Sequence, residues 1–519
     1  MSSFAQHAPS ANQATILSWL DEVREAIRVA PWSDLVDFDG IDAFDVLLSP
    51  VYLAMLNAVR NGSSAPPTTK RVTSQLRDWA YQAKVAWRER QTARGSAAPG
   101  PTDFLFWTRD VTHTVIMQPI AAAMIDQQDN CRMLACQAKI FRGLERLTPN
   151  PVYTVGAWPQ VVRAARREGT RRARQLALHG AWQLPVFPDP AVARPAAVVR
   201  SAVLQYLPLA AEAIANARCA LAAFRPKVLV VGNDLTAEGR AGCRVAAAEG
   251  VPSAAFMHGS ISGDRLQRYH IADLIGVYAP THRQVLAQHG IDTRRIAVCG
   301  APYLDSRPRQ SGQVHPQLQT QLGLKNGTPW VLVATSGPGN RISHEHHRQV
   351  IQELKSLARA IRPVPLVVKL HRKDHVDYYR EALEGHTHDK MIVVAEDTAG
   401  FPRKIFDWLQ GCNLVLTGAS TTAVEAMLMD VPVVTMDFCD EIHDVDFIDA
   451  CATIHVTTRE GLQQAVQGIL GEPTPPVELR ARAQAYLTDA FDALDGQSSR
   501  RCAQALRTLA DLAPNSNRP

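Results

Sequence analysis

LVLTGASTTAVEAMLMDVPVVTMD, residues 414–437, is the most informative stretch of this 519-residue chain. Its apolar run 414–416 predicts a strand, the hydroxyl-rich segment 417–422 predicts a turn, and a helix is expected from Ala423. A second apolar run, 431–436, predicts another strand. A strand, a helix and a strand in this order are typical of an α/β protein with a parallel sheet.

The turn of this unit carries hydroxyl groups where a phosphate could bind. Backbone N–H groups at a helix start, together with the positive end of the helix dipole, attract anions, and Ser420, Thr421 and Thr422 add side-chain donors. Glu425 follows about one turn later and could accept hydrogen bonds from a sugar diol. Serine and threonine are also ordinary helix N-caps, so a purely structural role stays open.

The unit resembles the nucleotide-binding segment of the two-domain B-fold (GT-B) glycosyltransferases, and 426–434 (AMLMDVPVV) matches its usual continuation. In that superfamily a Gly/Ser/Thr turn holds phosphate and a glutamate on the next helix holds the ribose. The resemblance therefore implies that Ser420, Thr421 and Thr422 bind phosphate and that Glu425 binds ribose. It implies a nucleotide-sugar as co-substrate, with no metal and no other cofactor.

Composition and charge narrow the class of protein. With 46% apolar residues, the chain can bury two sizeable cores, and a net charge of +5 is too small to favour nucleic acid as the main partner. Nine scattered cysteines predict reduced, buried thiols. No signal peptide opens the chain, and no segment approaches the roughly 20 apolar residues that span a bilayer. We expect a cytoplasmic protein that is at most peripheral at the inner face of the membrane.

Alternating strand and helix patterns after residue 100 predict two Rossmann-like, doubly wound α/β domains that face a cleft. The first hundred residues have helical periodicity and are expected to form an accessory or oligomerisation module, which would make the protein a homo-oligomer. The predicted divisions are a helical module at 1–100, an acceptor-side domain at 101–310, a linker at 311–327, a nucleotide-donor domain at 328–490, and a C-terminal helix and tail at 491–519.

Two residues at predicted strand ends of the first α/β domain are candidate bases. His258 precedes Gly259 at the end of a strand, and an imidazole there could deprotonate an acceptor hydroxyl. The segment FMHG, 256–259, resembles the His-Gly element of capsule, sialic-acid-type and teichoic-acid transferases, which implies a catalytic or acceptor-side role. Asp234 is the rival base, although it could simply cap the following helix, as His258 could cap a turn.

Two loops of the second α/β domain are expected to face the nucleotide. Lys369 and His371 lie on the same side of an extended strand and could contact one phosphate. They resemble the Lys-X-His-Pro element of capsule and teichoic-acid polymer transferases, except that Arg372 replaces the proline. The loop with Ser336, Gly337 and Gly339 could approach a phosphate closely, although its glycine spacing is not that of a dinucleotide site.

Two further patterns have both a functional and a structural interpretation. The arginines between Arg163 and Arg174 predict a basic helix face, which is either simply solvated or binds an anionic polymer or membrane headgroups. His344, His346 and His347 suggest a metal, but no cysteine or carboxylate set in the sequence completes a site, so no metal is expected.

The resemblance to GT-B and capsule-type transferases, together with these patterns, implies a metal-independent inverting glycosyltransferase that moves a sugar from a nucleotide donor to a glycan or lipid-linked acceptor of the bacterial surface. His258 or Asp234 would be the base, and the cations and the 420–422 turn would stabilise the leaving phosphate. Three alternatives stay open. They are a glycerol- or ribitol-phosphate transferase, a nucleotide-sugar 2-epimerase with carboxylates from Asp234, Glu238 and Asp437, and a non-catalytic scaffold of the same fold.

Overall fold

The computed structural model divides the chain into two compact units. The first unit comprises Ala8–Asp305 with Ala493–Pro519, and the second comprises Ser306–Asp492. The structure describes the following residues: 11–61, 100–108, 111–135, 152–154, 158–179, 182–188, 194–257, 265–307, 313–336, 343–371, 374, 376–377, 379, 391–395, 398–402, 404–442, 445–472 and 476–512.

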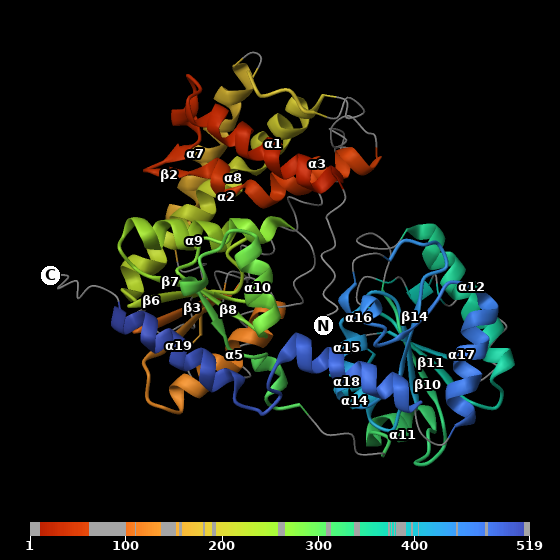
Figure 1. Ribbon diagram of the computed structural model, residues 1–519. Coiled ribbons are helices and arrows are strands. Elements are labelled where there is room, and N and C mark those ends of the chain that lie inside the picture. Colours follow the sequence, from red (N-terminus) through yellow and green to blue (C-terminus); the bar gives the residue numbers. More distant parts are fainter. Residues whose placement is uncertain are drawn as a thin grey trace. The chain divides into compact units, whose positions relative to one another are not determined.

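The first unit is built on a parallel seven-stranded sheet, with strand order β5-β4-β3-β6-β7-β8-β9 (Figure 1). Its strands are β3 (Phe104–Thr108), β4 (Cys131–Ala135), β5 (Val152–Thr154), β6 (Val228–Val231), β7 (Ser253–Phe256), β8 (Leu274–Val277) and β9 (Ile296–Val298). Every residue of β3, β6, β7 and β8 is buried, as expected for parallel strands covered on both faces.

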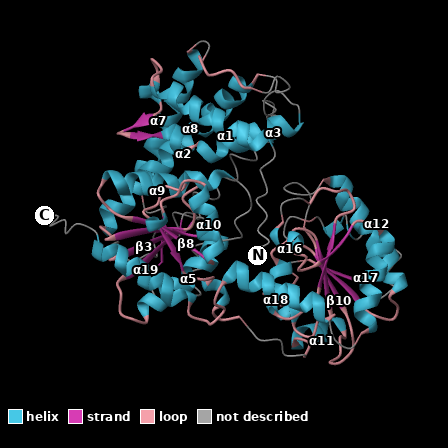
Figure 2. Cartoon of the chain, viewed as in Figure 1, coloured by secondary structure: helices cyan, strands magenta, loops and turns pink. Residues whose placement is uncertain are grey.

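Nine α-helices of the first unit fall within the described residues. They are α1 (Ala11–Arg28), α2 (Ala43–Val46), α3 (Leu48–Asn61), α5 (Val111–Ile125), α7 (Pro159–Leu178), α8 (Pro195–Phe224), α9 (Ala237–Ala248), α10 (Pro280–Gln288) and α19 (Ser498–Leu512). Two short strands, β1 (Asp37–Phe38) and β2 (Ile41–Asp42), form a hairpin before α2. Helices lie around the sheet in Figure 2, and α19 packs against α5.

The N-terminal helices share their core with the first α/β sheet. Leu20 of α1 and Val51 of α3 are fully buried in the same hydrophobic cluster as Leu105 of β3 and Val231 of β6. The described part of the predicted separate module, 11–61, is therefore an integral layer of the first unit. Residues 62–99 of the predicted helical module 1–100 lie outside the described residues.

Helix α8 satisfies the length and hydropathy expected of a membrane-spanning helix, and it is the one such helix in the described part of the chain. More than half of its most apolar window, 56%, is buried inside the protein. It packs against α3, α7 and α9, and its buried residues belong to the hydrophobic cluster of the first unit. These contacts are those of a core helix.

The second unit has a parallel six-stranded sheet, with strand order β12-β11-β10-β13-β14-β15. Its strands are β10 (Val331–Ala334), β11 (Leu366–Lys369), β12 (Met391–Val394), β13 (Leu414–Thr417), β14 (Val433–Met436) and β15 (Ile454–Val456). Helices described there are α11 (Pro316–Leu322), α12 (His344–Ala360), α14 (Ile405–Leu409), α15 (Thr422–Leu428), α16 (Asp446–Asp449), α17 (Arg459–Gly471) and α18 (Val477–Phe491). Both sheets thus have Rossmann-like, doubly wound strand order, which confirms the predicted fold class.

Three details differ from the sequence-based expectation. Helix α11 lies inside the predicted linker 311–327 and belongs to the second unit. The Ala/Leu/Arg-rich segment 477–513 predicts one helix, but it forms two, α18 and α19, because the chain turns between them at Asp492 and Gly496, which both have positive φ. The eight described cysteines are free thiols, but Cys451 is exposed and Cys219 and Cys439 are only partly buried.

Candidate functional site

The candidate nucleotide site lies where the strand order of the second sheet reverses. Strand β10 pairs with β11 on one side and with β13 on the other, all in parallel, so their carboxyl ends lie at one edge. The chain leaves β10 at Thr335, leaves β11 at Leu370 and leaves β13 at Gly418. Ligands of open α/β sheets bind at this edge and at this reversal of strand order.

The hydroxyl-rich turn forms as the sequence predicts, with the helix starting one residue earlier. Helix α15 begins at Thr422, after Thr421, whose side chain is exposed and makes no capping hydrogen bond. The Ser420 hydroxyl accepts a hydrogen bond from the Thr422 N–H at 3.3 Å. Ser420 therefore already stabilises the turn, and the role of the three hydroxyls in phosphate binding stays a prediction.

Glu425 and Lys369 come together from α15 and β11. Burial raises the pKa of the Glu425 carboxyl to about 7, and the charge of the nearby Lys369 acts against this rise. The Lys369 ammonium lies 5.9 Å from the centroid of the Trp408 ring, which is buried on α14. Sequence reasoning missed Trp408, since an isolated tryptophan gives no motif. The pair places a cation and a titratable carboxyl at the same sheet edge.

The loop after Lys369 is held by the buried carboxylate of Asp374, which no sequence motif singles out. The Asp374 carboxylate accepts hydrogen bonds from the Thr335 hydroxyl at 2.5 Å and from the His371 N–H at 2.9 Å. Burial acts to raise the pKa of Asp374, but contacts with His347 and Thr335 outweigh it and lower the pKa below its ordinary value. The backbone of His371 is thus fixed by the end of β10, although Arg372 follows it where the Lys-X-His-Pro element has a proline.

Of four further predicted site residues, the structure describes one. Ser336 is partly buried directly after Thr335, where the sequence places it. Gly337, Gly339 and His258 lie outside the described residues. Their roles remain predictions.

Asp234 of the first unit is placed as a structural carboxylate. It is fully buried, and it accepts hydrogen bonds from the N–H groups of Ile271 at 2.6 Å and Ala272 at 2.9 Å. His270 Nδ1 lies 2.5 Å from its other oxygen. Burial alone would raise the pKa of Asp234, but His270 and these backbone donors hold that pKa well below its usual range. A base needs an accessible lone pair, so this geometry does not suit the predicted catalytic role.

The carboxylate of Asp437, a candidate for sugar chemistry in the 2-epimerase alternative, also accepts hydrogen bonds from the protein backbone. It is buried at the end of β14, and its two oxygens accept hydrogen bonds from the N–H groups of Glu441 and Ile442 at 2.9 and 3.0 Å. Two of the three carboxylates named for the 2-epimerase alternative therefore hold loops in place.

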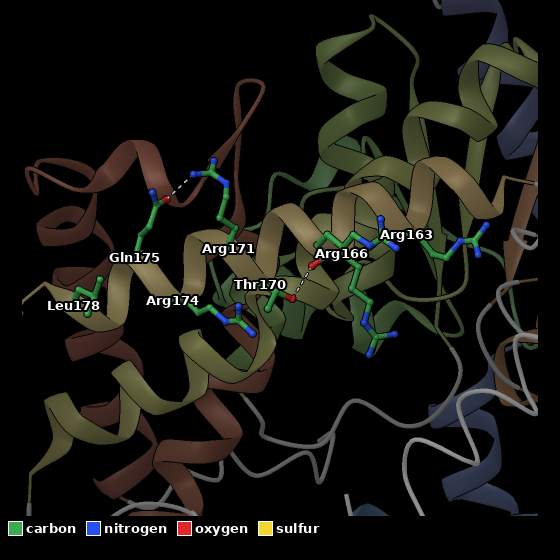
Figure 3. A pocket seen from close by; sticks show the side chains of 8 residues that line it. Arg163, Arg166, Thr170, Arg171, Arg174, Gln175 and Leu178 are labelled. Carbon is green, nitrogen blue, oxygen red and sulfur yellow. Dashed lines mark hydrogen bonds between the residues drawn. The ribbon is translucent and has the colours of Figure 1, made fainter. Parts of the chain in front are cut away.

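The basic run forms most of one helix, α7, and lines a shallow pocket on the first unit (Figure 3). Arg172 differs from the other arginines. Its guanidinium lies 4.4 Å from the centroid of the Phe38 ring and donates a hydrogen bond to the Glu168 carboxylate. Arg163, Arg167 and Arg174 are exposed, and none of them has an ion pair within the part of the chain that the structure describes. The helix therefore offers uncompensated positive charge.

A family model supplies the assignment that the site geometry leaves open. The model of UDP-N-acetylglucosamine 2-epimerase matches residues 207–507, more than half of the chain. The chain belongs to this family. No curated protein sequence matches it.

Solved structures show the same two-domain fold. The UDP-GlcNAc 2-epimerase of Methanocaldococcus jannaschii is 15% identical, with a TM-score of 0.52 over 78% of this chain and 99% of that chain. The Neisseria meningitidis enzyme bound to UDP-GlcNAc is 12% identical, with a TM-score of 0.50 over 78% and 100%. Staphylococcus aureus MnaA with UDP is 12% identical, with a TM-score of 0.51 over 79% and 97%. At this identity the likeness concerns the fold.

The family assignment corrects the preferred function. A GT-B-like fold and an enzyme family that handles nucleotide sugars agree with the sequence-based expectation. The findings favour the 2-epimerase alternative over the glycosyltransferase, and they lend no specific support to the capsule or teichoic-acid transferase families. Short turn motifs could not separate these reactions, because the nucleotide half of the substrate is common to all of them.

Proposed function

We propose that this protein binds a UDP-activated N-acetylhexosamine and inverts the configuration at C2 of the sugar. The observation that carries the proposal is the 2-epimerase family match over residues 207–507, which includes the whole second sheet and strands β6 to β9 of the first. The solved relative bound to UDP-GlcNAc supports the choice of ligand class.

The second unit supplies the nucleotide contacts in this proposal. Lys369 and the 420–422 turn bind the diphosphate, because an ammonium and backbone N–H groups at a strand end complement its charge. Glu425 binds the ribose hydroxyls. Its raised pKa, about 7, means that it is partly protonated near neutral pH and can both donate and accept a hydrogen bond.

Inversion at C2 requires one group to remove a proton and another to return it on the opposite face. Asp234 and Asp437 do not meet this need, since their carboxylates are occupied by hydrogen bonds within the protein. We assign one of the two proton transfers to His258, because imidazole is the side chain that most often serves as a general acid or base. No acceptor glycan takes part in this reaction.

Incubation with UDP-GlcNAc in deuterium oxide, followed by proton NMR, tests the reaction. We expect the signals of the 2-epimer to appear and the C2 proton to be replaced by deuterium, because the proton is exchanged with solvent during inversion. Intact, undeuterated UDP-GlcNAc in the presence of demonstrated UDP binding would refute epimerisation and favour the scaffold. Release of UDP only when an acceptor glycan is added would favour a transferase.

We also propose three wider properties of the protein. The basic face of α7 is proposed to contact anionic headgroups, the N-terminal helices to mediate self-association, and the protein to act in the cytoplasm. Each has a direct measurement: vesicle co-sedimentation, sedimentation equilibrium, and cell fractionation.

A further inference from the structure

Three potential metal ligands from distant parts of the second unit lie together. The side chains of His346, at the start of α12, and of Cys439 and Glu441, in the loop after β14, place their ligand atoms within 4.8 Å of one another. Tetrahedral zinc, with bonds of about 2.0–2.3 Å, holds its ligand atoms roughly 3.5 Å apart. Small side-chain rotations would bring this set into that geometry.

The decisive feature is the unsatisfied nitrogen of His346. The residue is 1% exposed, and its Nδ1 has no hydrogen-bond partner among the described residues. The nearest carboxylate oxygens, from Asp437 and Glu441, both lie 3.6 Å away, too far for a normal hydrogen bond. A buried polar atom without a partner is costly, and a metal ion at this point would satisfy it.

The adjacent His347, also in the first turn of α12, does have hydrogen-bonding partners. The unsatisfied nitrogen is therefore particular to the position of His346. Its Nε2 lies 2.6 Å from the Tyr379 hydroxyl and 3.4 Å from Asp374. Successive helical residues project about 100° apart, so the two imidazoles enter different surroundings. The neighbouring His344 is exposed.

The surroundings of the cluster also suit a cation. Glu441 Oε2 accepts a hydrogen bond from the Ser343 N–H at 2.6 Å, which orients the carboxylate as outer contacts orient metal ligands. Asp437 adds negative charge beside His346 while its oxygens accept backbone N–H groups. The Glu441 side chain is 28% exposed, so an ion can reach it from solvent.

We propose that His346, Cys439 and Glu441 bind a divalent transition-metal ion of the zinc type. Nitrogen, thiolate and carboxylate ligands together match zinc and cobalt, whereas magnesium and calcium require oxygen ligands. Binding releases the thiol proton of Cys439 to solvent and forms the metal–sulfur bond. Three protein ligands leave one coordination position for water or an oxygen of a bound ligand.

Titration of the untagged protein with cobalt(II) tests the site. We expect the near-ultraviolet absorption of a cobalt–thiolate bond, visible bands of four-coordinate cobalt, and loss of both when zinc is added. Cys439→Ser should abolish the thiolate band, and His346→Gln should weaken cobalt binding at least tenfold. Glu441→Gln alters a partly exposed side chain, so the fold should persist, and it should weaken binding while keeping the thiolate band.

Two matched variants serve as controls. Cys451→Ser removes the exposed thiol of the same unit, and His344→Gln removes the exposed imidazole two residues from His346. Both should leave the cobalt spectrum and affinity unchanged. The proposal is overturned if the wild-type protein shows no cobalt–thiolate band, or if that band survives Cys439→Ser. Circular dichroism of each variant shows that a lost band is not a lost fold.

Discussion

The carboxylate of Asp45 lies 2.9 Å from Nη2 of Arg240, which is 195 residues later in the chain, and each residue is 1% exposed. Arg244 and Arg24 also contact this carboxylate, and Arg240 donates further to the backbone oxygens of Asp45 and Tyr269. Burial opposes ionisation, but the three guanidinium groups lower the pKa of Asp45 to about 2. The N-terminal helices are thereby joined to α9 by a buried ionic network.

Replacing Asp45 should strongly destabilise the first unit. Asp45→Asn removes the charge and leaves the Arg240 guanidinium buried without a counterion, and loss of one partner of a buried pair costs about 3–5 kcal/mol. Urea unfolding at pH 7 measures the loss. The control, Asp292→Asn, breaks the exposed pair with Arg294 and should leave the stability close to that of wild type. Equal effects of the two changes would contradict the structural role of Asp45.

Lys369→Ala should weaken UDP binding while leaving the fold intact. The ammonium stands beside Glu425 and Trp408, and loss of one charged hydrogen bond of about 1.5–3 kcal/mol corresponds to a ten- to hundredfold rise in Kd. Isothermal titration calorimetry with UDP provides the measurement. Lys325→Ala, on the exposed surface of the same unit, is the control and should bind as wild type does. An unchanged Kd for Lys369→Ala would remove Lys369 from the nucleotide site.

Glu425 should make stability depend on pH near neutrality. Because its folded pKa, about 7, is above its ordinary value of 4.5, the folded state holds this proton more tightly than the unfolded state does. The group therefore contributes stability below about pH 4.5, and this contribution is lost as pH rises to about 7. Glu425→Gln removes the titration. As the pH rises from 5 to 8, the free energy of unfolding of the variant should therefore increase relative to that of wild type by on the order of 1–3 kcal/mol.

Denaturant unfolding of wild type and Glu425→Gln at the two pH values gives this difference. Glu460→Gln, an exposed carboxyl of the same unit, is the matched control and should follow the wild-type pH dependence. If the stability difference between wild type and Glu425→Gln is the same at both pH values, Glu425 does not titrate as the structure indicates.

His258→Ala should separate catalysis from binding. Since nucleotide binding is assigned to the second unit and proton transfer to His258, UDP affinity should stay within about twofold, while deuterium incorporation at C2 should fall by about 10²-fold or more. The control is His179→Ala, an exposed histidine of the first unit. Weak UDP binding with normal turnover, the reverse pattern, would contradict the assignment.

Charge reversal on α7 should abolish attraction to anionic membranes. Arg163→Glu, Arg167→Glu and Arg174→Glu together reverse three exposed charges, and at about 1 kcal/mol per basic residue near the surface, binding to phosphatidylserine vesicles should fall by about a hundredfold or more. Co-sedimentation at low and high salt measures this. Reversal of Arg283, Arg294 and Arg359, which are exposed elsewhere, should have little effect. If both triple variants lose vesicle binding equally, the overall charge of the protein, rather than the basic face of α7, causes the attraction.

The chain's local patterns determined the fold class and the edge where the candidate site lies. Strands such as β6 and β13 are short and almost wholly apolar, and polar turns follow them. Their type could therefore be read from sequence, as could the positions of Ser420 after β13 and of Lys369 at the end of β11. These features depend on neighbouring residues and on the periodicity of buried faces. The reaction could not be read in the same way, because the turn motifs concern only the shared nucleotide.

Contacts between residues far apart in the chain decided the features that local patterns did not. The buried role of Asp234 depends on Ile271 and Ala272, the position of the His371 backbone depends on Thr335, and the core of the N-terminal helices depends on strands more than fifty residues away. His346 and the pair Cys439 and Glu441 stand almost a hundred residues apart and have no spacing motif, so their meeting could not be predicted from sequence. Sequence patterns report which face of an element is apolar; only the packed chain brings distant polar groups together and determines which are open to a ligand.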